Sequence, residues 1–164
     1  MTQQRVSPIV VTSQLPATVT QILCGAVGQS ASLQQWQDSS SNILGAITAG
    51  GVQLVQQPTP TAKTGNATLT IAELLTGIVT ATSATAVALT LPTGTLSEAG
   101  FFALSNNLAF DWSVINLGSA LGAVTMTPGT DHTYVGNTTV AISTSAQFRS
   151  RRTAANTWVT YRLA

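Results

Sequence analysis

Apolar residues that alternate with small or hydroxyl-bearing residues are the feature that most limits how this chain can fold. Val87, Leu89 and Leu91 are separated by single small residues, and the same alternation recurs in residues 110–114 and 124–127. A period of two places every second side chain on the same face of a β-strand. Strands with one buried and one wet face are typical of antiparallel sheets. These runs therefore predict a sheet whose strands are half buried.

Turn-forming residues separate the runs at intervals of roughly ten to fifteen residues, a spacing typical of sandwiches and jelly rolls. They are Pro92, Gly94, Gly118, Pro128-Gly129 and Gly136-Asn137. The last residues, 146–163, predict a hairpin with residues 153–156 as its turn. We therefore predict an antiparallel, jelly-roll-like β-sandwich over residues 66–164.

Two short helical turns are predicted within this β-domain. Residues 70–73, Thr-Ile-Ala-Glu, have the form of a capping box, in which the threonine and the glutamate each accept a backbone hydrogen bond from the other residue. Residues 95–98, Thr-Leu-Ser-Glu, repeat that form before Gly100. One short helix is expected at the first segment and a second turn at the other.

The chain is predicted to divide near residue 57. Residues 57–65 contain two prolines and no large apolar residue, which indicates an extended linker. Residues 1–20 predict an extended N-terminal arm, and residues 21–56 predict a small β-module. Its expected strands are residues 21–27, 31–37, 43–47 and 52–55. Three or four such short strands cannot form a core alone, so we expect the module to pack on the next domain or on copies of itself.

Charged residues are scarce, and their scarcity excludes several classes of function. Only 7% of the residues are charged and the net charge is +1, whereas soluble domains carry about 25% charged residues. A nucleic-acid binder needs clustered basic residues, and a membrane span needs about 18 consecutive apolar residues. The chain has neither pattern, and its beginning does not have the form of a signal peptide. We predict no nucleic-acid and no membrane partner.

The residues available for catalysis or metal binding are few. The single cysteine and single histidine form no zinc-ligand pattern, so we predict no metal and no cofactor. His132 follows Asp131, but a catalytic triad needs a third group and no G-x-S-x-G motif is present. The five carboxylates could include a glycosidase pair. However, Glu73 and Glu98 fill capping positions and Asp131 a turn, so we predict that the chain is not an enzyme.

Basic residues are concentrated near the end of the sequence. Four of the six lie there, namely Arg149, Arg151, Arg152 and Arg162. On a strand, Arg149 and Arg151 share one face and Arg152 lies on the other. This stripe has two interpretations. It either faces an anionic partner, such as an acidic shell protein or a polyanionic glycan, or it prevents an edge strand from pairing with other molecules.

Three tryptophans occur at strand spacing, at Trp36, Trp112 and Trp158. Aromatic side chains at such positions contribute large apolar areas to a core. We predict core positions for them, with sugar-stacking platforms as the alternative.

Residues 27–54 resemble a short module common in tailed-phage fibres and other virion surface proteins. Its form is a run of small residues, then Leu-x-x-Trp-x-Asp-Ser-x-x-x-x-Leu-x-x-Ile, then a glycine turn. The matching residues are Leu33, Trp36, Asp38, Leu44, Ile47 and Gly51. Ser41 departs from the pattern, because glycine is often seen at that place in the turn. In that family such modules form intertwined β-structure between three chains, so the resemblance implies a homotrimer.

A second resemblance covers the β-domain. Residues 89–95 and 112–116, together with Phe148 and Trp158, are similar to β-rich domains of phage head-decoration and fibre proteins. This resemblance implies a virion structural protein.

We therefore expect a capsid decoration (cement) protein on the outer surface of a phage head, which binds the major capsid protein and stabilises the lattice. The absence of long shaft repeats favours this role over the alternative, a head or tail fibre protein that binds host surface glycans. The module and the arm are expected to contact sister chains and the shell. The module residues expected at these contacts are Leu33, Trp36, Ile43, Leu44, Ile47, Val52 and Leu54.

Overall fold

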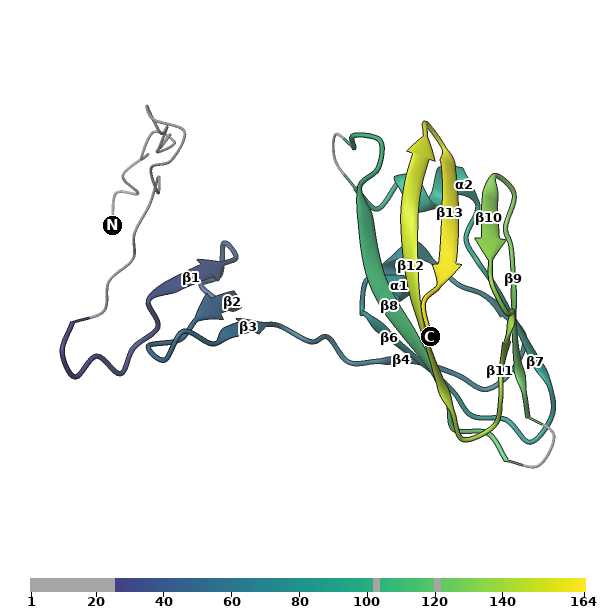
Figure 1. Cartoon of the computed structure of the whole chain (residues 1–164), viewed down its shortest axis with the longest axis horizontal. Coiled ribbons are helices and arrows are strands. Elements are labelled where there is room, and N and C mark those ends of the chain that lie inside the picture. The colour runs from purple at the N-terminus through teal and green to yellow at the C-terminus, as the bar shows by residue number, and fades with distance from the viewer. Residues whose placement is uncertain (1–25, 102–103, 120–121) are drawn as a thin grey trace. The chain divides into compact units, whose positions relative to one another are not determined.

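The computed structural model describes residues 26–101, 104–119 and 122–164 (Figure 1). The chain divides into two units, residues 1–56 and residues 57–164. This division falls at the start of the segment with two prolines, residues 57–65. The predicted arm and most of the predicted strand at residues 21–27 lie outside the described residues.

The first unit contains an antiparallel sheet in the order β1-β2-β3. Its strands are β1 (Gln34–Gln37), β2 (Ile43–Ile47) and β3 (Gln53–Val55). In the turn between β1 and β2, the Asp38 carboxylate accepts hydrogen bonds from the backbone N–H groups of Ser40 and Asn42 at 2.8 and 2.9 Å. Ser41 has a φ of 65° in this turn. Glycine adopts this left-handed conformation without strain, which is the physical reason that glycine is favoured at that place.

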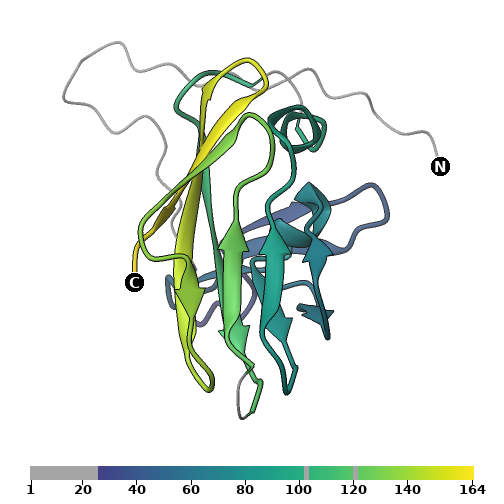
Figure 2. The ribbon, with the colours of Figure 1, turned by 90° about the vertical axis from the view of Figure 1, so that its right-hand side faces the viewer.

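The second unit is a β-sandwich of two sheets, and the predicted mainly-β fold is confirmed. One sheet has the order β10-β13-β12-β8-β6-β4 and the other, which Figure 2 views face-on, has the order β11-β9-β7-β5. The strands are β4 (Thr61–Lys63), β5 (Ala67–Thr68), β6 (Ile78–Ala81), β7 (Val87–Thr90), β8 (Ala109–Asn116), β9 (Val124–Thr127), β10 (His132–Val135), β11 (Thr139–Val140), β12 (Ser145–Ala154) and β13 (Thr157–Arg162).

The direction of the strands corrects the sequence-based expectation. From β4 to β9, successive strands alternate between the two sheets, and each return to the same sheet runs in the same direction. Strands β4, β6 and β8 are parallel, as are β5, β7 and β9. The prediction of an antiparallel, jelly-roll-like sandwich is therefore wrong for this part. The alternation of apolar and polar residues reports only which face is buried, and it is the same for either strand direction.

Antiparallel pairing is confined to the later strands of the sandwich. Strand β12 pairs antiparallel with both β8 and β13, and β11 pairs antiparallel with β9. The predicted terminal hairpin is confirmed as β12 and β13, with Asn156 at a φ of 55° in its turn.

The segment predicted as a linker contributes a strand. Residues 61–63 form β4, an edge strand that pairs parallel with β6. The two prolines precede this strand, so they remove no hydrogen bond from its ladder. The partner of β4 lies some eighteen residues later, as the register Thr61–Val79 shows. Local composition therefore could not reveal this strand.

Two short helices lie in the connections between the sheets. Helix α1 (Ile71–Leu74) follows β5 and has the predicted capping box. Helix α2 (Gly94–Glu98) begins earlier than predicted, because Thr93 rather than Thr95 is its N-cap and accepts a hydrogen bond from the N–H of Leu96. The first residue of α2 lies close to the terminal hairpin, which leaves no room for a side chain at this position. A Cβ atom at Gly94 would lie 1.8 Å from the carbonyl oxygen of Asn156.

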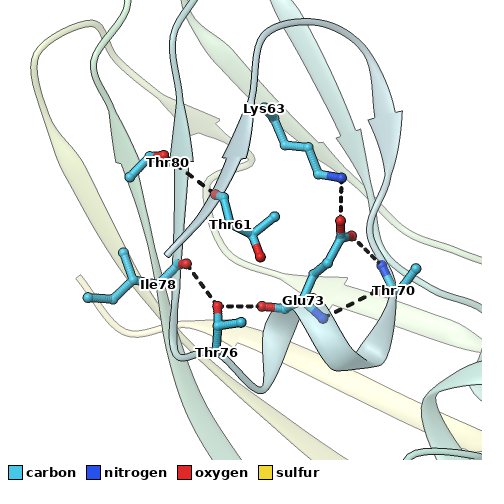
Figure 3. Close-up of polar contacts among 7 residues, drawn as sticks. All are labelled: Thr61, Lys63, Thr70, Glu73, Thr76, Ile78 and Thr80. Carbon is cyan, nitrogen blue, oxygen red and sulfur yellow. Dashed lines mark hydrogen bonds and ion pairs between the residues drawn. The ribbon is translucent and has the colours of Figure 1, made fainter. Parts of the chain in front are cut away.

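Glu73 joins three elements of the sandwich (Figure 3). One carboxylate oxygen accepts a hydrogen bond from Lys63 Nζ of β4 at 2.6 Å, and the other accepts one from the backbone N–H of Thr70 at 2.9 Å. The hydroxyl of Thr76 lies within hydrogen-bond distance of the carbonyl oxygens of Glu73 and Ile78. The edge strand β4, helix α1 and strand β6 are thereby fixed to one another.

The core lies between the two sheets. Apolar side chains from both sheets are almost completely excluded from solvent, among them Leu89, Met126, Val114, Trp112 and Phe148. The rings of Trp112 and Phe148 are in contact, with centroids 4.6 Å apart. The predicted core positions of Trp112 and Trp158 are confirmed, because each is 1% exposed.

We predict that Glu73→Gln lowers the free energy of unfolding by about 1 kcal/mol, because it removes the ion pair with Lys63 and replaces the charged acceptor of the Thr70 N–H by a neutral amide oxygen. Burial raises the pKa of Glu73, but hydrogen bonds from Lys63 and Thr70 outweigh it and place the pKa below 4.5. The stabilisation is therefore complete above pH 4.5 and is lost as the pH falls through the lower, folded-state pKa. Urea unfolding between pH 2.5 and 7 measures both effects.

Asp111→Asn is the matched control, since it removes a carboxylate from an ion pair whose two side chains are 52% and 40% exposed. Exposed pairs contribute little to stability. An equal loss in both variants would contradict the structural role of Glu73.

Candidate functional site

The sheet of the first unit carries apolar side chains on both faces. The register pairs Trp36 with Gly45 and Gly45 with Val55, so Trp36 and Val55 lie on one face. Ala46 pairs with Leu54, and these two residues lie on the opposite face. Within the described part of this unit, only Gly45 and Ala46 are buried.

The expected contact residues are largely exposed in this unit. The exposed ones are Trp36, Ile43, Leu44, Val52 and Leu54, with exposed fractions from 43% to 58%. Leu33 and Ile47 are half buried. The expectation that Trp36 is a core residue is wrong for the described chain, because its side chain is 45% exposed. Val55 was missed by sequence reasoning although it is 76% exposed. Its alignment with Trp36 across β2 is a property of the register.

Trp36 lies against the centre of the sheet. A Cβ atom at Gly45 would lie 3.3 Å from Cε3 of the Trp36 ring and 3.3 Å from the carbonyl oxygen of Leu54. The indole therefore occupies the space above the glycine, while its outer surface faces solvent. Shallow hollows on the sheet are lined by Trp36, Leu44, Leu54 and Val55 together with neighbouring strand residues.

The three strands of this sheet contain no charged residue; glutamine is their polar component. The adjacent carboxylate, Asp38, is engaged within its own turn. Hydrogen bonds from the side chain and backbone of Asn42, and from the backbone of Ser40, hold the pKa of Asp38 below 3.8. The sheet therefore offers an uncharged, apolar surface, which is the surface composition of obligate protein interfaces.

The arginines of the terminal hairpin are distributed as strand alternation predicts. Arg149 and Arg151 point outward from β12, whereas Arg152 is 8% exposed and points inward. Arg149 donates two hydrogen bonds to Asp111, at 2.6 and 2.7 Å. This pairing raises the pKa of Arg149 and lowers the pKa of Asp111.

The other three arginines also have partners within the sandwich. Arg152 donates to Glu98 at 2.6 Å and to Asn106. Arg162 donates to the carbonyl oxygens of Asn137, Thr139 and Ala164, and Arg151 donates to Asn107 and Tyr161. Carboxylates neutralise two of the four charges, so this hairpin presents less positive charge than its sequence suggests. Whether an anionic partner binds it stays a prediction.

The Asp131–His132 pair does not form a triad-like arrangement. His132 is 1% exposed, and its ring nitrogens lie 2.9 Å from the carbonyl oxygen of Pro92 and 2.8 Å from the hydroxyl of Thr160. Asp131 is exposed in a turn with a φ of 56°. The neighbouring hydroxyl of Ser97, 3.4 Å from His132, is itself buried.

Residues 26–101, 104–119 and 122–164 contain no group of three or more histidine, cysteine or carboxylate side chains that could hold a metal ion. Cys24 lies outside these ranges. In the same part of the chain, no helix has the length and apolar character needed to cross a membrane.

Comparison with protein-family models, with curated protein sequences and with solved structures gave no match. The uncharged apolar sheet of the first unit is therefore the candidate functional site, on the strength of its own geometry.

We predict that Arg152→Ala lowers the free energy of unfolding by about 2 kcal/mol, because it leaves Glu98 without its cation and opens space beside the core. Arg149→Ala on the same strand is the control. Its ion pair is exposed to water, so the urea midpoint should not change measurably. Equal midpoint losses in the two variants would contradict the difference in burial.

Proposed function

We propose that this protein is a structural component of a virus particle, a trimeric decoration (cement) protein that binds the major capsid protein of a tailed-phage head and stabilises the lattice. The observation that carries the proposal is the sheet β1-β2-β3, which exposes apolar side chains on both faces. A sheet of three short strands needs a covering layer to be stable in water. A permanent partner supplies such a layer.

Copies of the same chain are suitable partners for this sheet. Closed symmetric oligomers are the common way in which proteins cover a shared apolar surface. Near a symmetry axis equivalent residues meet, so a charge would face its own like charge. The strands contain none. Glutamine side chains both donate and accept hydrogen bonds, and they can therefore pair with their own copies. The resemblance of residues 27–54 to the trimeric virion module supports three chains.

The proposed role on the phage head rests on two features of the sequence. The β-domain is similar to domains of head-decoration and fibre proteins, and the chain has no long shaft repeats. Three ion pairs and an apolar core stabilise the sandwich, as a protruding domain requires. Its binding to the shell would bridge neighbouring capsid subunits. Labelling at the tail tip, or saturable binding to host cells, would instead support a fibre that binds host glycans.

We predict that the full-length protein has three times the chain mass of 16.9 kDa in solution. Leu54→Asp should reduce it to the monomer mass, because a buried carboxylate without a partner is strongly unfavourable. Leu163→Asp is the control, since Leu163 of the sandwich is 49% exposed against 53% for Leu54. Sedimentation equilibrium measures the mass. A monomeric wild-type protein with a folded first unit would exclude self-assembly.

We also predict that phage heads without this protein release their DNA sooner on heating or chelation. Addition of the wild-type protein should restore their stability, and Leu54→Asp should restore less, because bivalent or trivalent attachment is lost. Release of DNA can be followed with an intercalating dye. Equal release from heads with and without the protein would exclude the cement role.

A further inference from the structure

A chain of buried hydrogen bonds runs across four neighbouring strands of the six-stranded sheet. Trp112 Nε1 lies 2.9 Å from the hydroxyl of Ser150, which lies 2.8 Å from the hydroxyl of Thr160. The Thr160 hydroxyl lies 2.8 Å from Nε2 of His132, and Nδ1 of His132 lies 2.9 Å from the carbonyl oxygen of Pro92. The four side chains are at most 1% exposed. The bonds connect β8, β12, β13 and β10 with the segment that leads into α2.

When His132 is neutral, the chemistry of the two ends fixes the direction of every bond in this chain. An indole N–H can only donate and a carbonyl oxygen can only accept. Ser150 therefore accepts from Trp112 and donates to Thr160, which donates to Nε2 of His132. Nδ1 of His132 carries the ring proton and donates it to Pro92. Neutral His132 satisfies all of these groups at once.

A second proton on His132 is incompatible with this arrangement. Protonated Nε2 would have to donate to Thr160, whose hydroxyl would then turn its own proton toward Ser150. Ser150 already accepts from Trp112, so its own hydroxyl proton would lose its acceptor. Buried polar groups without partners are costly, and the cost is greatest in a connected network.

The charged groups around His132 do not compensate an additional positive charge. Asp131, which precedes this strand, is exposed, and Tyr134 on the strand donates its hydroxyl proton to the carbonyl oxygen of Asn137. From β12 and α2, Arg152 and Glu98 face this end of the sandwich, but they neutralise each other. Strand β13 contributes Trp158, whose ring centroid lies 6.5 Å from that of His132. Among the described residues, no carboxylate lies within ion-pair distance of His132.

We propose that His132 is an acid-sensitive latch: helix α2, through Ser97, and the Pro92 segment cover the neutral ring, and when the ring binds a proton they open so that water reaches the buried charge. The bond from Nδ1 to Pro92 is available in both protonation states, so the burial of the charge is what drives the opening. The parallel strands of the sandwich stay closed, because their core is apolar and does not include His132. The polar α2 end therefore opens first, as a local unfolding unit.

The pH range of the latch follows from the burial of the imidazole. Burial lowers the pKa of His132 below 6.5, and the hydrogen bond to Pro92 opposes this shift only in part. The open state binds the proton more readily than the closed state. The stabilisation is therefore complete above pH 6.5 and is lost as the pH falls from 6.5 toward the folded-state pKa. Within that range, the population of the open state rises about tenfold per pH unit.

Hydrogen exchange and histidine NMR of the full-length protein between pH 4 and 8 test the latch. The chain contains a single histidine, so its ring resonances report only His132. We expect the folded protein to keep a neutral ring well below pH 6.5. The amides of α2 should exchange up to tenfold faster per pH unit below 6.5, after correction for the intrinsic rate, while the amides of β7 and β9 keep their rates. A ring that titrates at 6.5 or above, or equal acceleration throughout the sandwich, would overturn the proposal.

Two pairs of variants separate His132 from other titrating groups. His132→Gln, which cannot titrate, should abolish the change between pH 6.5 and 4.5, whereas Glu98→Gln should preserve it, because the pKa of Glu98 lies below 4.5. Thr160→Val removes the hydroxyl that donates to Nε2 and should raise the pKa of His132. Thr133→Val, on the outer face of β10, should leave the titration unchanged. This second pair keeps the test decisive if His132→Gln does not fold. An unchanged pKa in Thr160→Val, or an unchanged pH dependence in His132→Gln, would contradict the latch.

Discussion

The burial of one face of each strand is the constraint on which the sandwich depends. Side chains such as Leu89 and Met126 from one sheet meet Val114 and Phe148 from the other, and all four are excluded from water. Because the chain passes alternately from one sheet to the other, each added pair of strands extends both sheets together. The neighbouring strands that are built in this way from β4 to β9 are parallel. The edge strand β4 belongs to the sheet through its backbone pairing with β6. Of its three residues, only Lys63 forms an ion pair.

The few charges of the chain are used to fix its irregular parts. Lys63 and Glu73 hold the first edge strand to α1, and Arg152 and Glu98 hold α2 to the terminal hairpin. The carboxylate of Glu98 also accepts the N–H of Asn156 in the hairpin turn. Partly buried charges need partners of this kind, since the loss of water around them is otherwise unfavourable. The three strands of the first unit, by contrast, contain no charged residue and expose apolar side chains.

Local sequence patterns predicted the local parts of this structure well. The strands of the module, the terminal hairpin and the capping box at Thr70 each depend on residues that are close in sequence, and each was predicted. The direction of strand pairing, the strand at residues 61–63 and the start of α2 at Thr93 depend on partners far along the chain, and these were not. The exposed position of Val55 beside Trp36 and the neutralisation of Arg149 by Asp111 likewise follow from register.

The sequence by itself determined that this chain is mainly β, with strands that each bury one face, because the period of two in its apolar residues is a property of single strands. It also determined how little charge is available for any surface. Only the tertiary structure decided that neighbouring strands from β4 to β9 are parallel and that a line of hydrogen bonds connects His132 to Trp112. It likewise decided that the apolar side chains of β1 to β3 are exposed within their unit. These features depend on which segments meet in space, and the alternation of residues along one strand contains no information about the strand beside it.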